Sequence, residues 1–316
     1  MKTAGFDIGG LLVLVAAAIL QGCSPSSAPA AAVASPSHGT FAGQFNIGGG
    51  RELYLQCQGM GAPTVILESG YHDSSSLWSQ SETRPPVPSS PAVLPGIARF
   101  THVCTYDRPG TLVYDTNPPK IGTRSTPVKM PRTAGDVVTD LHELLAKAGV
   151  PGPYILVGHS LGGLFVRLYA QTHPDQVSGV VLVDAFAAEI PALFGAQWAA
   201  YNQLLDHPGT PYDNDQSFET IDISASVTQI EHAPPWRRMP LAVLTKTEPF
   251  PLPPGTPSGL GPQLERVWTA AAADMVGLEP QTPHTFVTGS DHYIQVRDPD
   301  VVVQTVRLVI GRAKHG

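Results

Sequence analysis

The segment GHSLG, residues 158–162, places Ser160 between two glycines, directly after the apolar run 153–157. Gly158 and Gly162 leave room for a turn that bulkier side chains would obstruct. A residue held in such a turn is strained by typically about 1–3 kcal/mol, and such strain is tolerated mainly at functional sites. The motif therefore predicts that Ser160 is a nucleophile. A serine hydroxyl needs a base to take its proton, so the chain should also supply a histidine.

The elements around this turn alternate along the chain. A helix over 133–149 is indicated by Val137, Leu141 and Leu144, which fall on one face, and Gly149 supplies its end. The other expected elements are a hairpin over 43–59, strands over 63–70, 101–108, 153–158, 177–185, 240–246 and 284–289, and helices over 161–173, 262–277 and 298–313. Strands that alternate with helices predict an α/β fold with a mostly parallel sheet covered on both faces.

This order of elements, with G-x-S-x-G between a strand and a helix, resembles the α/β-hydrolase fold over residues 41–313. The resemblance implies Ser160 as nucleophile and His292, in the loop TGSDHYIQ after the last strand, as its base. The acid of the triad is implied between them in the chain. Asp184, at the end of strand 177–185, and Glu248, after strand 240–246, both fit. We favour Asp184, because a short carboxylate on a rigid strand end gives better geometry, and Glu248 is the competing acid.

The same resemblance implies an oxyanion hole made of two backbone N–H groups. One belongs to Leu161, directly after the nucleophile. The other is expected after strand 63–70, where Ser69 and Gly70 make Tyr71 the donor. Arg108, with Asp107 in the segment YDRPG, is interpreted as structural.

The N-terminus predicts export. An apolar run of about 12 residues follows Lys2 and is too short to span a bilayer. It ends in LQGC, which resembles the lipobox of bacterial lipoproteins, with Cys23 as the lipidated residue. We therefore expect a signal peptide over 1–22, a flexible Ser/Pro/Ala tether over 23–40 and a membrane-anchored lipoprotein; a plain secretory signal with a secreted or periplasmic product is the alternative.

Without Cys23, two cysteines remain in an oxidising compartment, Cys57 and Cys104, each in an expected strand. The residues alone leave open whether they are two buried apolar side chains or a disulfide. The α/β-hydrolase resemblance makes their strands neighbours and so implies a Cys57–Cys104 disulfide.

Residues 186–238 are expected to form a cap inserted into a single hydrolase domain over 41–316. Six apolar side chains at helical spacing would cover the serine: Leu193, Phe194, Trp198, Tyr201, Leu204 and Leu205. They favour a small ester substrate with an apolar acyl or alcohol portion. The predicted function is a serine esterase or lipase-like hydrolase that forms an acyl-enzyme. Dehalogenase and epoxide hydrolase chemistry is disfavoured, because those enzymes have an aspartate at the place of Ser160.

Two other functions stay open. A peptidase or amidase on the same fold would need an acidic subsite for a substrate amine, and the segment Asp213-Asn214-Asp215 could supply it. The other alternative is a non-catalytic ligand-binding lipoprotein.

The composition of the chain further limits the classes of function, partner and cofactor. The chain has 316 residues, 42% of them hydrophobic, and a net charge of −7 without Lys/Arg clusters, which argues against a nucleic-acid partner. No motif for a metal or a phosphate cofactor is present, so no cofactor is predicted. Proline-rich stretches at 85–95, 117–131 and 249–262 indicate long connecting loops.

Overall fold

A computed structural model describes residues 39–83, 89–252 and 256–314. The predicted signal peptide, Cys23 and the expected tether up to residue 38 lie outside the described residues. Among the described residues, no helix is both long enough and apolar enough to cross a bilayer.

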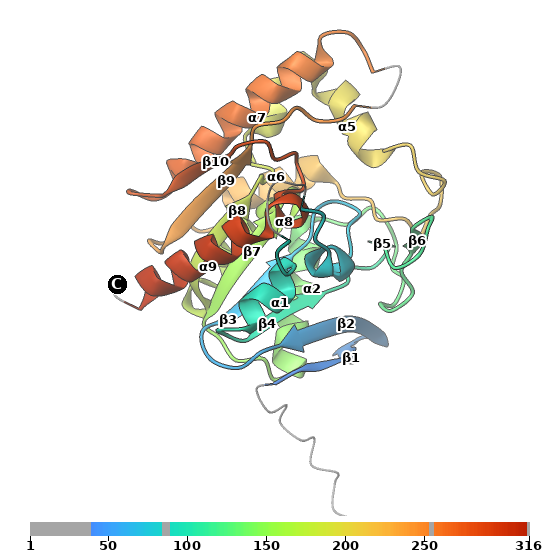
Figure 1. The fold of residues 1–316 in the computed structure, drawn as a ribbon. Coiled ribbons are helices and arrows are strands. Elements are labelled where there is room, and N and C mark those ends of the chain that lie inside the picture. Colours follow the sequence, from blue (N-terminus) through green and yellow to red (C-terminus); the bar gives the residue numbers. More distant parts are fainter. Residues whose placement is uncertain (1–38, 84–88, 253–255, 315–316) are drawn as a thin grey trace, which may run out of the picture. The chain divides into compact units, whose positions relative to one another are not determined.

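The centre of the fold is an eight-stranded sheet in the order β1-β2-β4-β3-β7-β8-β9-β10 (Figure 1). β1 pairs antiparallel with β2, and β2 antiparallel with β4, whereas all later neighbours are parallel. The strands are β1 Phe41–Gly48, β2 Arg51–Gln58, β3 Thr64–Glu68, β4 Val103–Tyr106, β7 Tyr154–His159, β8 Val177–Val183, β9 Leu241–Lys246 and β10 His284–Val287. The predicted α/β class with a mostly parallel sheet is confirmed.

Helices cover both faces of this sheet, which explains why its central strands are apolar runs rather than alternating sequences. Along β7, Leu156 packs into a core with α2, α3 and α7, while Ile155 and Val157 face a second core with α1 and α9. The helices are α1 Val93–Ala98, α2 Ala134–Lys147, α3 Gly162–Thr172, α4 Ile190–Phe194, α5 Trp198–Asp206, α6 Ile223–His232, α7 Leu260–Val276, α8 Ile294–Arg297 and α9 Pro299–Ala313.

Some elements within the expected loops were not predicted. Helix α1 begins inside the proline-rich stretch 85–95, with Pro95 in its first turn, where a proline removes no helical hydrogen bond. The stretch 117–131 contains β6, Lys120–Ile121, which pairs with β5, Leu112–Val113. Each of these strands has two residues, too few to show a period.

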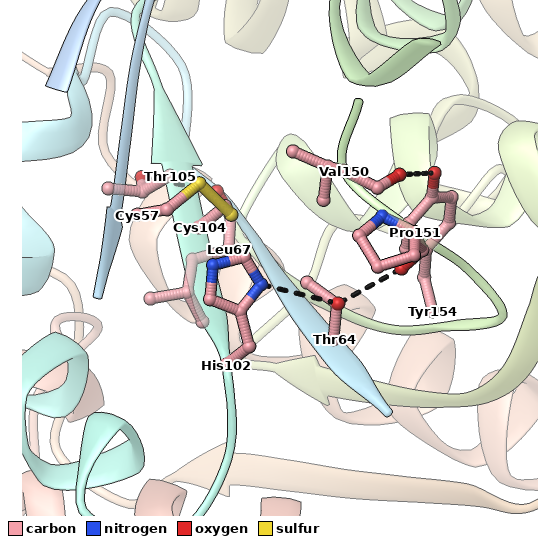
Figure 2. The surroundings of a disulfide bond; sticks show 9 residues. All are labelled: Cys57, Thr64, Leu67, His102, Cys104, Thr105, Val150, Pro151 and Tyr154. Atoms are coloured by element: carbon pink, nitrogen blue, oxygen red, sulfur yellow. Dashed lines mark hydrogen bonds between the residues drawn. A yellow bond between two sulfur atoms is a disulfide. The ribbon is translucent and has the colours of Figure 1, made fainter. Parts of the chain in front are cut away.

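A disulfide joins β2 to β4 (Figure 2). Cys57 lies directly opposite Cys104 in the antiparallel register, and both are fully buried. His102 lies beside them, so these three residues bring possible metal ligands together. Because both sulfurs belong to the disulfide, neither is a thiolate that could bind a metal.

Candidate active site

Ser160 occupies the sharp turn between β7 and α3. Its φ of +49° lies in the left-handed region, which non-glycine residues rarely adopt. Two contacts with the segment that ends β8 hold this strained backbone: the Ser160 N–H donates to the Val183 oxygen at 3.2 Å, and the Ser160 oxygen accepts from the Phe186 N–H at 2.7 Å. The turn therefore presents the hydroxyl at the carboxyl end of the parallel strands.

The two glycines of the motif are required by close packing. A Cβ at Gly158 would lie 2.7 Å from the carbonyl oxygen of Gly162. A Cβ at Gly162 would lie 2.6 Å from the carbonyl oxygen of Glu68, on the neighbouring strand. Neither backbone neighbour can move away cheaply, so larger residues would displace Ser160.

His292 is oriented by Asp184. The Asp184 Oδ2 atom lies 2.6 Å from His292 Nδ1, and the Asp184 side chain is fully buried. Its Oδ1 atom accepts the Lys246 N–H at 3.1 Å, so both carboxylate oxygens have a partner. The side chain of the competing acid, Glu248, is exposed, and among the described residues it forms no hydrogen bond or ion pair with His292. The structure thus brings Asp184, and not Glu248, to the histidine.

Ser160 and His292 line the same cavity. In the described part of the chain, no hydrogen bond joins the Ser160 Oγ atom to His292 Nε2. Catalytic hydrogen bonds are often long without substrate and shorten in the reacting complex, so this arrangement is compatible with proton transfer between the two residues.

His159, directly before the candidate nucleophile, lies against the candidate base. Its Nε2 atom is 2.9 Å from the backbone oxygen of His292, and the two rings are 4.7 Å apart. Burial, together with the nearby His292, holds the pKa of His159 well below its usual value. The neutral ring can therefore donate from Nε2 to the His292 carbonyl, which fixes the backbone of the candidate base.

The loop after β3 brings a second backbone N–H toward Ser160. Gly70 packs against the serine: a Cβ there would lie 3.1 Å from the Ser160 Cβ. Among the described residues, the N–H groups of Tyr71 and Leu161 donate no hydrogen bond. These are the two groups expected to form an oxyanion hole. Their unpaired state leaves them available to a ligand.

This loop is held on both sides of Tyr71. The Arg108 guanidinium donates to the Ser69 oxygen at 2.9 Å and to the Gly70 oxygen at 2.6 Å. On the other side, the His72 N–H donates to Glu219 Oε2 at 2.8 Å. The peptide groups that flank the candidate donor are thus fixed before any substrate binds.

The inserted residues between β8 and β9 also hold the loop. The Tyr71 hydroxyl donates to Asp206 at 2.8 Å and accepts the Ile221 N–H at 2.9 Å. The His72 ring stacks between the rings of Tyr71 and Phe218, at 3.8 and 4.3 Å. The insertion and the loop after β3 are therefore packed as one unit.

Arg108 lies in a buried charge network. It donates to Glu68 at 2.6 Å and to Glu219 at 2.6 Å, and all three side chains are nearly inaccessible. Burial alone would lower the pKa of Arg108. The negative charges of Glu219 and Glu68 outweigh this effect and raise the pKa well above its usual value. Burial raises the pKa of Glu68, which also accepts a hydrogen bond from Tyr106. The expected structural role of Arg108 agrees with this arrangement.

The cavity over Ser160 has a volume of about 370 Å³ and is lined mostly by apolar side chains. Of the expected cap residues, Tyr201, Leu204 and Leu205 line it. Phe194 is buried and stacks on Tyr201 at 4.5 Å, while Leu193 is exposed. The insertion therefore covers the serine with part of its expected apolar face.

The described geometry matches a known family. The family model of the alpha/beta hydrolase fold matches residues 63–229, more than half of the chain. The chain belongs to the α/β-hydrolase family.

Among similar proteins, an uncharacterized protein of Schizosaccharomyces pombe is 32% identical over 151 residues, which are 42% of this chain and 26% of that protein. The chain spans less than half the length of the curated relatives it matches. The solved structure of E-2-(acetamidomethylene)succinate hydrolase has a TM-score of 0.53 at 17% identity, covering 86% of this chain and 99% of that one. The esterase RhEst1 from Rhodococcus sp. ECU1013 has a TM-score of 0.52 at 18% identity, covering 85% and 98%.

The acidic segment Asp213-Asn214-Asp215 of the insertion does not form the subsite for a substrate amine that was considered from the sequence. Asp213 accepts hydrogen bonds from Gly209 and Thr210, and Asp215 from Ser217, so both cap an exposed turn. Neither lines the cavity over the serine. The sequence analysis missed Asp73, whose buried carboxyl does line it. The only available signal was an acidic residue in the segment expected to form the oxyanion hole.

Proposed function

We propose that this chain is a serine hydrolase that cleaves carboxylic esters through an acyl-enzyme. The observation that carries the proposal is the 2.6 Å contact between His292 Nδ1 and Asp184 Oδ2 in a cavity that also contains Ser160 in its strained turn. A nucleophile, a base and a group that orients the base define this class of chemistry.

In this mechanism, Ser160 Oγ attacks the ester carbonyl as His292 Nε2 takes its proton. Asp184 keeps the proton of His292 on Nδ1 and stabilises the imidazolium. The N–H groups of Leu161 and Tyr71 bind the oxyanion. The tetrahedral intermediate expels the alcohol, which takes the proton from His292. A water molecule, activated by His292, then hydrolyses the acyl-enzyme and releases the acid.

The cavity supports substrates with an apolar portion. Phe186, Phe250 and Trp268 form part of its lining, with Phe250 and Trp268 packed edge-on at 4.9 Å. Its lining also includes polar side chains near the serine, among them Asp73 and His292, and such groups fix the orientation of a ligand in small-molecule sites. A similar fold in the esterase RhEst1 is compatible with this proposal.

Export and lipidation form a separate proposal that rests on the sequence. The apolar run and LQGC before residue 24 favour a lipoprotein anchored through Cys23, with the hydrolase domain outside the cytoplasm. A disulfide between Cys57 and Cys104 is compatible with an oxidising compartment.

Labelling and hydrolysis test the enzymatic proposal. A fluorophosphonate probe should label wild type on Ser160, and a ladder of p-nitrophenyl esters from short to long acyl chains should be hydrolysed. Ser160→Ala should abolish both, while Ser224→Ala, a matched change of an exposed serine on α6, should retain both. Ester hydrolysis by Ser160→Ala within about tenfold of wild type would contradict the mechanism, because triad loss costs far more.

An amidase is the second candidate, favoured by the buried acid Asp73 in the cavity. Aminoacyl anilides, assayed beside the esters, distinguish the two reactions. Faster turnover of anilides than of esters with the same acyl group would favour the amidase.

A further inference from the structure

The hydrolytic mechanism leaves one acidic side chain of the cavity without a role. Asp73 lies three residues after Gly70, is only 2% exposed, and lines the cavity together with Ser160 and His292. Burying a carboxyl group is unfavourable unless its charge is paired and its oxygens accept hydrogen bonds. The contacts of Asp73 meet these needs only in part.

One carboxyl oxygen has a partner and the other has none. Asp73 Oδ1 accepts a hydrogen bond from the Tyr114 hydroxyl at 2.9 Å. Oδ2 has no hydrogen bond within the described residues. It lies 3.1 Å from the position that a Cβ on Gly70 would occupy, where the Ser160 Cβ lies at 3.1 Å and His159 Nδ1 at 2.8 Å. The unpaired oxygen and the Ser160 Cβ are therefore within about 6 Å of each other, and both residues line the same cavity.

No cation of the described chain neutralises this carboxyl. Arg108 acts on Asp73 electrostatically, but its guanidinium forms its ion pairs with Glu68 and Glu219. His292 acts on it more weakly, and its Nδ1 atom is already bonded to Asp184. The charge that Asp73 acquires on ionisation is therefore not paired within the protein.

The other groups that face Asp73 are neutral at neutral pH. Tyr114 and Tyr293 are phenols, and the negative charge of Asp73 raises the pKa of Tyr293. Burial lowers the pKa of His72 and that of His159, whose Nδ1 atom lies on the same side of Gly70 as Asp73 Oδ2, so both rings are uncharged. Burial raises the pKa of Asp73 itself to about 7, against the hydrogen bond from Tyr114 and the charges of Arg108 and His292. Glu219 adds to this rise.

We propose that Asp73, held by Tyr114, forms a subsite beside Ser160 that binds a protonated amine of the substrate. The substrates would be esters that carry an ammonium group a few bonds from the scissile carbonyl, in the acyl or the alcohol portion. The ammonium donates to Asp73 Oδ2 and supplies the missing positive charge. This subsite deepens the proposed esterase function and rests on it for turnover, but not for binding.

Matched pairs of esters test the subsite by turnover. Ethyl 3-(dimethylamino)propanoate and ethyl 4-methylpentanoate have the same shape and differ in one charged atom. The pair 2-(dimethylamino)ethyl butanoate and 3-methylbutyl butanoate places that difference in the alcohol. For at least one pair, wild type should prefer the cationic ester by about 10- to 100-fold in kcat/KM, the range expected for a charge-assisted hydrogen bond. The preference should rise between about pH 6 and pH 8 as Asp73 ionises, since the amines stay protonated there.

Variants assign this preference to its residue. Asp73→Asn should lose the preference, and the ratio is taken within each variant so that a general effect on hydrolysis cancels. Asp215→Asn removes an exposed acid of the insertion that does not line the cavity and should keep the wild-type ratio. An equal ratio in wild type and Asp73→Asn, with neutral esters hydrolysed, would overturn the subsite and leave the esterase standing. An ester that carries a hydroxyl group in place of the amine is a further control. If wild type prefers it over the neutral ester as strongly as it prefers the cationic ester, Asp73 binds a neutral donor, and the proposal of a cationic substrate is overturned.

Binding to an inactive protein separates the subsite from the reaction. In Ser160→Ala, calorimetry should give a dissociation constant about 10- to 100-fold lower for the cationic ester of the selected pair than for its neutral partner. The double variant Ser160→Ala/Asp73→Asn should bind both alike. This measurement decides the subsite even if wild type hydrolyses no ester, and equal binding in Ser160→Ala would refute it.

Discussion

The Nε2 atom of His159 lies 2.9 Å from the carbonyl oxygen of His292, so the residue before the candidate nucleophile holds the backbone of the candidate base. Two residues 133 positions apart are joined by a partly buried hydrogen bond that no local motif describes. Its disruption should affect the chemical step more than substrate binding.

His159→Phe keeps a ring but removes the donor. We expect kcat to fall by about 10- to 100-fold with KM changed by less than about threefold, because a small displacement of a catalytic group is costly. His159→Gln should recover part of kcat, since its amide can donate to the same carbonyl. Steady-state kinetics check this, with His142→Phe on α2 as the matched control. An unchanged kcat in folded His159→Phe would show that the hydrogen bond does not position His292.

The two candidate acids are separated by Asp184→Asn and Glu248→Gln. Asp184→Asn should lower kcat by an order of 10⁴, because the amide favours the wrong tautomer of His292. Glu248→Gln should leave kcat nearly unchanged, because its exposed side chain does not contact the ring. Both are measured on one p-nitrophenyl ester. The opposite ranking would make Glu248 the acid.

Glu219→Gln tests the buried network under the oxyanion loop. The substitution leaves Arg108 paired with one carboxylate and weakens the hydrogen bond that Glu219 accepts from the His72 N–H. We therefore expect the free energy of unfolding to fall by about 3–5 kcal/mol. Glu231→Gln, on the exposed face of α6, should change stability by less than about 0.5 kcal/mol. Urea unfolding measures both, and equal stabilities would show that the network adds nothing.

Asp73→Asn should alter stability in a pH-dependent way. In the folded protein the pKa of Asp73 is about 7, against 3.8 for the free side chain, so between these values the folded state holds a proton that the unfolded state releases. The contribution of Asp73 to the free energy of unfolding therefore falls by roughly 4 kcal/mol in all as the pH rises from about 4 to about 7. The variant should have a higher Tm than wild type at about pH 8 and a similar Tm at about pH 4. Parallel Tm curves would contradict the raised pKa.

Cys23 tests the anchor. Labelled palmitate should be incorporated into wild type expressed in a bacterium, and Cys23→Ala should release the protein from the membrane fraction. Cys57→Ala/Cys104→Ala is the matched control for loss of cysteine and should retain the label. Equal membrane association of wild type and Cys23→Ala would leave only a secretory signal.

Local patterns were sufficient for the fold and for part of the site. Ser160 could be recognised because its turn is encoded in five consecutive residues, and the strands because burial on two faces produces apolar runs. His292 was found through its place after the last strand. Asp184 and Glu248 stayed in competition, because both follow strands that end at the same edge of the sheet and a sequence contains no distance across that edge.

Residues whose role depends on tertiary contacts were missed or misread. Asp73 is one polar residue in a polar segment until its burial and its unpaired oxygen are known. Glu219 reaches Arg108 from 111 residues away. The contact of His159 with His292 was missed, because nothing in GHSLG shows that the loop of His292 passes beside it.

The disulfide between β2 and β4 also has a mechanical consequence. β1 is an edge strand that pairs only with β2, and it begins at Phe41, just after the expected tether. A pull on the N-terminal end of the described chain would load the β1–β2 ladder first and could open it from Phe41 onward. Cys57 lies opposite Phe41 and is bonded to Cys104, so the tension then passes through a covalent link into the interior of the sheet. The hairpin can yield under force while the parallel strands that carry Ser160 and Asp184 keep their register.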